Sequence, residues 1–81
     1  MENYEIQKIN IDNFYKKVGN NVKRIREKKG FSQLQLANEI GHNSVGHIAK
    51  AEIYAYNKRF NLEQLYKISI VLQVDIKDFF D

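Results

Sequence analysis

The sequence of 81 residues contains no cysteine and no proline. Without cysteine, disulfide bonds and thiolate metal sites are excluded. The sequence also has no apolar run longer than a few residues, which predicts neither a membrane-spanning helix nor a secretory signal. We therefore expect a cytoplasmic protein with one small domain, whose hydrophobic content of 43% supplies a single core.

Positive charge is concentrated in the middle of the chain. Residues 13–59 contain ten Lys or Arg and three Asp or Glu, whereas the remaining residues contain three and seven. The net charge of +3 therefore combines a basic middle with acidic ends. Such a distribution makes the middle of the chain the candidate for binding a polyanion.

Helical periodicity begins clearly at residue 14. The apolar residues of one helical face predict a helix over residues 14–29, and they are Phe14, Val18, Val22 and Ile25. Gly30 follows, where a left-handed C-terminal cap is expected. Residues 1–11 precede this pattern, and we expect them to form an N-terminal extension that is a helix, a strand-like arm or a disordered tail.

Three further helix starts carry N-capping residues, two of them within a capping box. These are Ser32 with Gln35, Asn61 with Gln64, and Asp75. They predict helices over residues 33–40 and 62–72 and a short last helix at the end of the chain. The buried residues expected from these helices are Leu36, Ala37, Ile40, Leu62, Leu65 and Ile68. Together, the patterns predict an all-α domain.

A further helix is expected between Gly41 and Tyr54, with Ser44 as its N-cap. At 100° per residue, one face would carry Val45, Ile48, Ala49 and Glu52, and the opposite face Gly46, His47 and Lys50. A helix of two turns is unstable alone, so it must pack against its neighbours and leave the outward face free. Two short helices joined by a tight turn are typical of a motif that presents its second helix as a probe.

The segments VGNNVKRIREKKGFSQLQLANEIG, HIAKAE and NLEQLYKISIVLQVDIKDFF resemble the helix-turn-helix domain of the phage repressor and Cro family, the xenobiotic-response-element (XRE) family. The resemblance covers residues 14–80. It implies a compact five-helix lambda-repressor-like domain over residues 12–81, preceded by the extension at residues 1–11. It also implies a sequence-specific regulator of transcription that places its third helix in the major groove of double-stranded DNA.

The resemblance assigns residues to the DNA contact. Gln33 matches the glutamine of the family that binds phosphate from the start of the second helix. The residues expected to contact bases are Asn43, Ser44, His47 and Lys50. Further phosphate contacts are expected from Lys23 and Arg24 on the first helix and from Lys58 and Arg59 in the loop after the third. Arg26 and Glu52 match a pair that forms an internal salt bridge.

The resemblance also implies a dimer that forms through the C-terminal helices. Ile70 and Phe80 are the candidate interface residues; in the alternative, both complete the core of the monomer. A two-fold dimer would set its recognition helices about 34 Å apart and would read an inverted repeat. A repressor is expected, because 81 residues leave no room for a separate activation domain.

Two other classes of function remain as alternatives. An antitoxin or another partner-binding module could use the same fold to hold a protein such as a toxin. An enzyme would have to draw on His42, His47, Glu39 and Glu52, whose spacing matches no metal or nucleophile motif. We therefore expect no enzyme, no cofactor and no metal. We also expect the aromatic residues of the loop to pack rather than stack on bases, and these are Tyr54, Tyr56 and Phe60.

Overall fold

A computed structural model describes residues 6–41 and 45–81. Within these residues the chain forms four α-helices and two short 3-10 helices, without any strand. In chain order they are α1 (Lys8–Lys28), α2 (Gln33–Glu39), α3 (Val45–Ile53), η1 (Ala55–Asn57), α4 (Leu62–Leu72) and η2 (Ile76–Phe80). The predicted all-α class is confirmed, and the fifth expected helix is the 3-10 helix η2.

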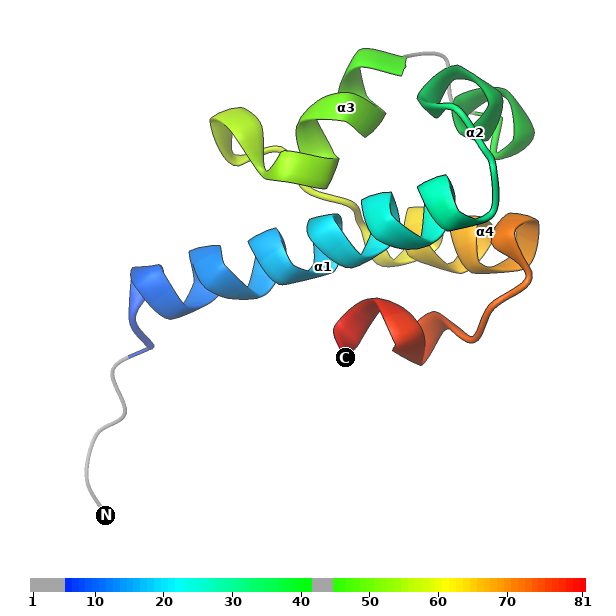
Figure 1. Cartoon of the computed structure of the whole chain (residues 1–81). Helices are drawn as coiled ribbons and strands as arrows, with labels where there is room; N and C mark the ends of the chain where they lie inside the picture. Colours follow the sequence, from blue (N-terminus) through cyan, green and yellow to red (C-terminus); the bar gives the residue numbers. More distant parts are fainter. Residues whose placement is uncertain (1–5, 42–44) are drawn as a thin grey trace.

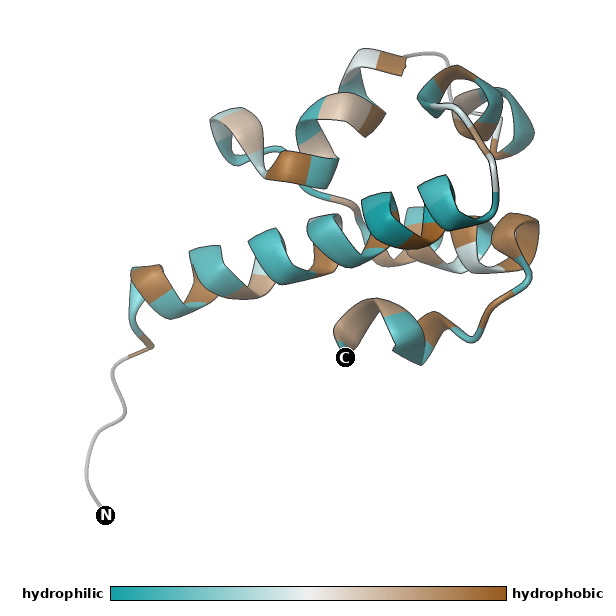
Figure 2. Ribbon diagram, in the orientation of Figure 1, coloured by the Kyte–Doolittle hydropathy of each residue, from teal (hydrophilic) through white to brown (hydrophobic). Residues whose placement is uncertain are grey.

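The other elements are arranged around α1. Helices α2 and α3 and the η1 turn lie on one side of α1, and η2 lies on the other (Figure 1). Hydrophilic residues cover much of α1, whereas hydrophobic residues dominate α4 and the C-terminal segment (Figure 2). The fully buried side chains of the core come from all four α-helices and from η2, and the largest of the apolar ones are Phe79, Leu36, Ile48, Ile68, Leu72 and Val22.

Helix α1 begins at Lys8, six residues earlier than the apolar spacing predicts. Residues 8–11 of the predicted extension form the first turn of α1, so the helical alternative holds for these residues. The early start is supported by distant residues, because the Tyr54 hydroxyl donates a hydrogen bond to Asp12 Oδ1 at 2.8 Å. The ring of Phe14 also stacks on Phe80, with 6.2 Å between the ring centroids. None of these contacts can be read from local periodicity.

The predicted caps of α2 and α4 are confirmed. In each capping box, the N-cap side chain accepts a hydrogen bond from the third backbone N–H of the helix, and the third side chain accepts one from the N-cap N–H. Asp75 caps η2 by accepting from the N–H of Lys77. Gly30 and Gly41 have φ values of +80° and +72°, which glycine adopts more readily than other residues. These local signals therefore fix where α2 and α4 begin.

The predicted burial is correct for five of six residues, and Leu62 is the exception. Its side chain is 73% exposed. Because Leu62 lies four and eight residues before Tyr66 and Ile70, it belongs to the same row on the helix surface, and both of those residues are also exposed. The inner face of α4 is formed instead by Leu65, Ile68 and Leu72.

Candidate nucleic-acid interface

The start of α2 is fixed by its capping box. The Ser32 hydroxyl accepts a hydrogen bond from the Gln35 N–H at 3.0 Å, and Gln35 Oε1 accepts one from the Ser32 N–H at 2.8 Å. Gln33 is consequently the first helical residue, as predicted. Its side chain is half-buried, and its Nε2 donates a hydrogen bond to Glu52 Oε1 at 3.0 Å. The residue assigned to phosphate thus also joins α2 to α3.

Arg26 and Glu52 form a buried ion pair between α1 and α3. Arg26 Nε donates to Glu52 Oε2 at 2.6 Å, and Arg26 Nη2 donates to Glu52 Oε1 at 3.1 Å. The remaining guanidinium nitrogen, Nη1, donates to the Phe31 carbonyl oxygen at 2.7 Å. Both carboxylate oxygens of Glu52 therefore accept a hydrogen bond from Arg26, as a buried charge requires. Oε1 also accepts the hydrogen bond from Gln33. The network holds α3 against α1 and α2 at once.

Gly19 lets α1 and α3 approach each other closely. A Cβ atom at this position would lie 2.4 Å from the Ala51 carbonyl oxygen and 2.7 Å from that of Glu52. Real Cβ atoms do not approach backbone this closely, so the helices could not cross here with any larger residue. Glycine in the middle of a helix lowers the stability of the helix relative to alanine. At position 19, glycine is explained by the close packing of α1 against α3.

The inward face of α3 differs from the predicted one. Ile48, Ala51 and Glu52 are buried, whereas Val45 is exposed and Ala49 is half-buried. The close approach at Gly19 explains the difference, because it turns the side of α3 that carries Ala51 toward α1. The solvent side includes Lys50, as predicted. Asn43 and Ser44, the other predicted base contacts of this region, lie outside the described residues, as does the predicted cap role of Ser44.

His47 does not point directly away from the body of the protein. Its ring is half-buried and packs edge-on against Phe60, with 6.3 Å between the ring centroids. Its position on α3 therefore places it between the solvent side and the connection to α4. The predicted base contact of His47 stays a prediction.

The segment after α3 has an unusual backbone. Tyr54, Tyr56 and Asn57 have φ values between 54° and 60°, in the left-handed region that residues with a Cβ atom rarely occupy. Tyr54 and Phe60 are buried, and their predicted packing is confirmed. The same prediction is wrong for Tyr56, whose side chain is 84% exposed, because its backbone directs the ring away from the core.

Tyr54 anchors this segment to the first turns of α1. Its hydroxyl donates to Asp12, which also accepts a hydrogen bond from Lys8 Nζ at 2.8 Å. The hydrogen bond from Lys8, followed by that from Tyr54, lowers the pKa of Asp12 below its ordinary value. The same contacts with Asp12 raise the pKa of Tyr54 and of Lys8. The charged carboxylate is thus the form that holds this cluster together.

The two cations assigned to the loop are both exposed, but they differ in their contacts. The guanidinium of Arg59 lies over the ring of Tyr15, at 4.7 Å from its centroid. Tyr15 in turn stacks on Tyr54, with 5.7 Å between the ring centroids. This cation–π contact holds the guanidinium of Arg59 against the ring of Tyr15. Lys58 follows η1 directly as its C-terminal cap.

The two cations assigned to α1 lie on different sides of the helix. Lys23 is one turn from Gly19 and therefore lies on the side that faces α3. Arg24 lines a groove of about 260 Å³ with Asp78 and Asp81, on the side of the C-terminal segment. Helical geometry therefore places Lys23 on the α3 side of α1, and Arg24 faces the C-terminal segment.

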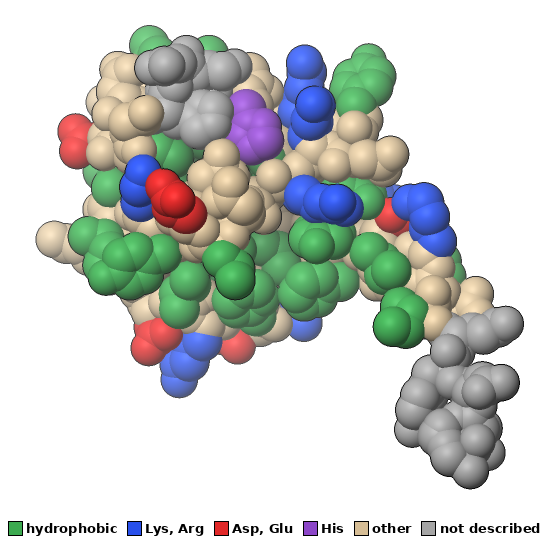
Figure 3. Space-filling view, turned by 180° about the vertical axis from the view of Figure 1, so that it is seen from behind, with side chains coloured by type: hydrophobic (Ala, Val, Ile, Leu, Met, Phe, Trp, Pro, Cys, Tyr) green, Lys and Arg blue, Asp and Glu red, His purple; other side chains and the backbone are tan. Residues whose placement is uncertain are grey.

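The two candidate dimer residues also differ. Ile70 is 60% exposed and lines a groove of about 550 Å³ together with Ile40, Gly41, Tyr66 and Val71. Phe80 is half-buried and stacks on Phe14. Hydrophobic side chains form a broad band on the face seen from behind (Figure 3). Ile70 is thus a surface residue, whereas Phe80 contributes to the packing of the monomer.

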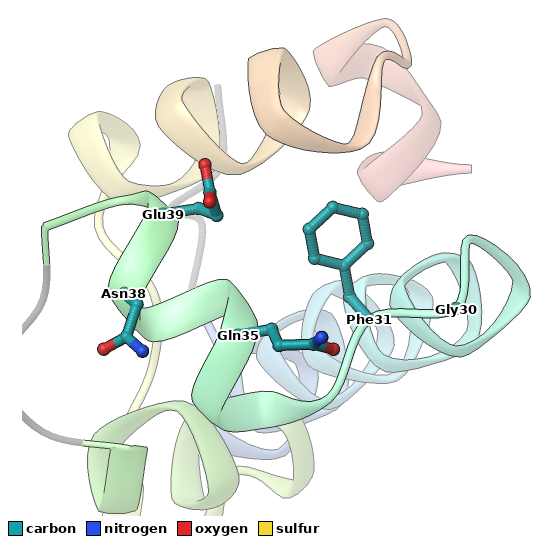
Figure 4. Close-up of a pocket in the computed structure, with 5 residues that line it drawn as sticks. All are labelled: Gly30, Phe31, Gln35, Asn38 and Glu39. Atoms are coloured by element: carbon teal, nitrogen blue, oxygen red, sulfur yellow. The ribbon is translucent and has the colours of Figure 1, made fainter.

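Another hollow, of about 320 Å³, lies where the α1–α2 turn meets α2. In Figure 4, the side chains of Phe31 and Glu39 extend into the space beside α2. Gln35, another lining residue, already serves the capping box. Within residues 6–41 and 45–81, no three His, Asp or Glu side chains are grouped as metal ligands would be, and no helix is long and apolar enough to cross a membrane.

Sequence reasoning missed three features of this region. They are the hydrogen bond from Gln33 to Glu52, the close approach at Gly19, and the cluster of Asp12, Tyr15 and Tyr54. Only Gly19 gives a local signal, since glycine inside a helix suggests a packing reason. The other two join residues that are 19 or more positions apart.

Comparison with known proteins agrees with this geometry. A helix-turn-helix family model, of the XRE type, matches residues 22–79, which is more than half of the chain. The match begins inside α1 and ends inside η2, so it includes both short helices and their supports. No curated protein matches the chain.

Proposed function

Because the chain belongs to the XRE-type helix-turn-helix family of DNA-binding regulators, we propose that it represses transcription by binding a specific operator through α3. The observation that carries this proposal is the attachment of α3. Gly19 and the Arg26–Glu52 pair hold one side of this short helix, while Lys50 is exposed on another side. A rigidly held helix with an exposed polar side chain suits readout in the major groove.

The proposed contacts divide into two kinds. Lys50 and His47 are the described candidates for base contacts, with Asn43 and Ser44 beside them in sequence. Gln33, Lys23, Lys58 and Arg59 are proposed to bind phosphates around the same groove, and phosphate contacts fix register rather than sequence. Arg24 is the weakest member of the proposed set, because it lines the groove beside the C-terminal segment and not the side of α1 that faces α3.

We further propose that the protein binds DNA as a two-fold dimer through α4. Leu62, Tyr66 and Ile70 form an exposed row along this helix, next to the groove that Ile40 and Val71 line. Exposed apolar rows of this kind mark protein interfaces. Of the two residues suggested by the sequence, Ile70 is the stronger support, because Phe80 already packs against Phe14.

The test is selection of bound duplexes from a random DNA pool at about 150 mM salt, where non-specific phosphate binding is weak. We expect an enriched inverted repeat whose half-sites lie about ten base pairs apart. Enrichment of a single half-site would retain sequence-specific binding and contradict the dimer. A pool without enrichment would contradict the proposed function.

Two lysine-to-alanine variants distinguish base recognition from non-specific electrostatic binding to phosphates. Lys50→Ala should weaken binding to the selected site by about 1–3 kcal/mol and relax preference at particular base pairs. Lys23→Ala should weaken binding to all DNA alike and flatten the dependence on salt. Equal losses on specific and non-specific DNA for both variants would contradict the assignment of Lys50.

A second candidate function is that of an antitoxin or a related module that binds a partner protein. The same exposed row of α4 supports it, since an apolar surface can accept a different chain as well as a second copy. Measurement of the molecular mass by light scattering distinguishes the repressor from the partner-binding module. A dimer of this chain alone favours the repressor, whereas a monomer that enriches DNA only with a co-purified protein favours the partner-binding module.

A further inference from the structure

The η1 turn leaves one large aromatic side chain in solvent. Tyr56 is 84% exposed, although the neighbouring Tyr54 and Phe60 are buried. The Lys50 Nζ atom lies over the Tyr56 ring at 5.8 Å from its centroid. This contact joins the exposed cation of α3 to the turn that follows the helix.

The backbone at Tyr56 and Asn57 has an uncommon, left-handed conformation. Tyr56 has a φ of 54°, and Asn57 after it has a φ of 60°. Residues with a Cβ atom rarely adopt this conformation, and at such outliers function is a reasonable hypothesis. Tyr54 shares the conformation, but it packs in the core and donates a hydrogen bond to Asp12. Tyr56 has no comparable burial, and its side chain contacts Lys50.

The contact restricts where the Lys50 ammonium can go. A lysine side chain has a flexible stem of four carbons, and it loses much conformational freedom when its ammonium group is fixed on a partner. A ring beneath the ammonium attracts it through the negative face of the π-system. It also leaves the ammonium hydrogens on the far side free to donate to a base or a phosphate. The ring therefore limits the conformational freedom that Lys50 would lose on binding DNA.

We propose that Tyr56 is a positioning residue for DNA recognition, which holds the Lys50 ammonium at the DNA-facing side of α3. The proposal rests on the proposed function and adds a residue outside the predicted contacts. Tyr56 then acts through Lys50 and reads no base itself. Its role depends on the aromatic ring and not on the hydroxyl group.

The test is a double-mutant cycle on DNA binding. Tyr56→Leu should weaken binding to the selected site about twofold to fivefold, and Tyr56→Phe should bind as tightly as the wild type. In a Lys50→Ala background, Tyr56→Leu should have no further effect, because the group that it positions is absent. The lost discrimination should fall at the base pairs that Lys50→Ala also relaxes. Melting temperatures should equal that of the parent, since Tyr56 is exposed.

A second readout needs no DNA. The ring should shift the NMR resonances of the Lys50 side-chain methylene groups upfield in the free protein. Tyr56→Phe should keep this shift, and Tyr56→Leu should remove it. An unchanged shift in Tyr56→Leu would overturn the proposal even if DNA binding weakened.

The outcomes separate this proposal from the function on which it rests. If the wild type shows no sequence preference, the proposed function fails and this proposal fails with it. If Lys50→Ala weakens specific binding and Tyr56→Leu does not, the proposal alone is overturned. It is also overturned if Lys50→Ala has no effect, or if Tyr56→Leu weakens binding equally in both backgrounds.

Discussion

The two ends of α1 are held by different kinds of contact. The inner segment, residues 18–26, carries all the buried residues of the helix: Val18, Gly19, Val22, Ile25 and Arg26. The outer segment, residues 8–15, has none, and it is fastened by the hydrogen bond from Tyr54, the ring stack of Tyr15 and the contact of Phe14 with Phe80.

This difference separates the framework of the fold from an added fastening. The family match at residues 22–79 begins within the inner segment, and this segment packs against α3. The outer segment precedes that match and reaches the end of α3 through the η1 turn. Changes in the inner segment should therefore affect global stability, and changes in the outer segment should act locally.

The largest effect is expected at the ion pair of the inner segment. Glu52→Ala should lower the free energy of unfolding by about 3–5 kcal/mol, because it leaves the Arg26 charge buried without a partner. Urea unfolding measures this change. Glu52→Gln is the matched control, since it keeps the shape and one acceptor and should lose less. A loss below about 1 kcal/mol for Glu52→Ala would show that the pair is not what holds α3.

Gly19→Ala should have the next largest effect. The new Cβ atom would meet the Ala51 carbonyl oxygen at 2.4 Å, so α1 and α3 must separate, at a cost of about 1–3 kcal/mol. The better helix propensity of alanine offsets part of this cost. Asn20→Ala, at the next and exposed position of the same helix, should be nearly neutral. If both variants melt alike, the close approach does not limit the packing of α3.

In the outer segment, Tyr54→Phe should have a smaller and local effect. The substitution removes the hydrogen bond to Asp12 and keeps a ring that can stack on Tyr15. Backbone amides of residues 8–14 should exchange faster with solvent, while those of residues 18–26 should keep their protection. Hydrogen exchange followed by NMR measures both sets in one sample. Uniformly faster exchange would show that the two segments unfold as one unit.

The smallest effect is expected in the dependence of stability on pH. The pKa of Asp12 lies below its ordinary value of 3.8, so its contribution is fully present above that value and disappears as the pH falls through the folded-state pKa. The pKa of Tyr54 is raised above 10.0, so its contribution is present below pH 10 and disappears as the pH rises through the raised pKa. Between about pH 4 and pH 10, the contributions of Asp12 and Tyr54 to stability are therefore both fully present.

An NMR titration of the Asp12 carboxyl group tests this directly. Lys8→Met should raise the pKa of Asp12 toward 3.8 more than Tyr54→Phe does, because the hydrogen bond from Lys8 is the larger cause of its depression. The reverse order for Lys8→Met and Tyr54→Phe would contradict the arrangement of the cluster.

Local signals in the sequence predicted much of this fold. Ser32 and Asn61 begin α2 and α4 because a capping box involves residues only three positions apart. Apolar periodicity, another local signal, placed the start of α1 too late, because the stabilising partners there are Tyr54 and Phe80. It also failed on α3, where the approach at Gly19 turned Ala51 inward in place of Ala49. The proposed contacts with DNA combine such local placement with the family resemblance and stay predictions.

The sequence by itself determined the all-α class, the caps, the basic middle of the chain and the family. These properties depend on composition, on short-range periodicity and on hydrogen bonds between near neighbours, all of which can be read along the chain. Only the tertiary structure decided that Ala51 and not Ala49 faces inward on α3, that Gln33 joins the Arg26–Glu52 pair, and that Tyr56 stays exposed beside Lys50. These properties depend on how distant helices pack, and packing is set by contacts that no local pattern records.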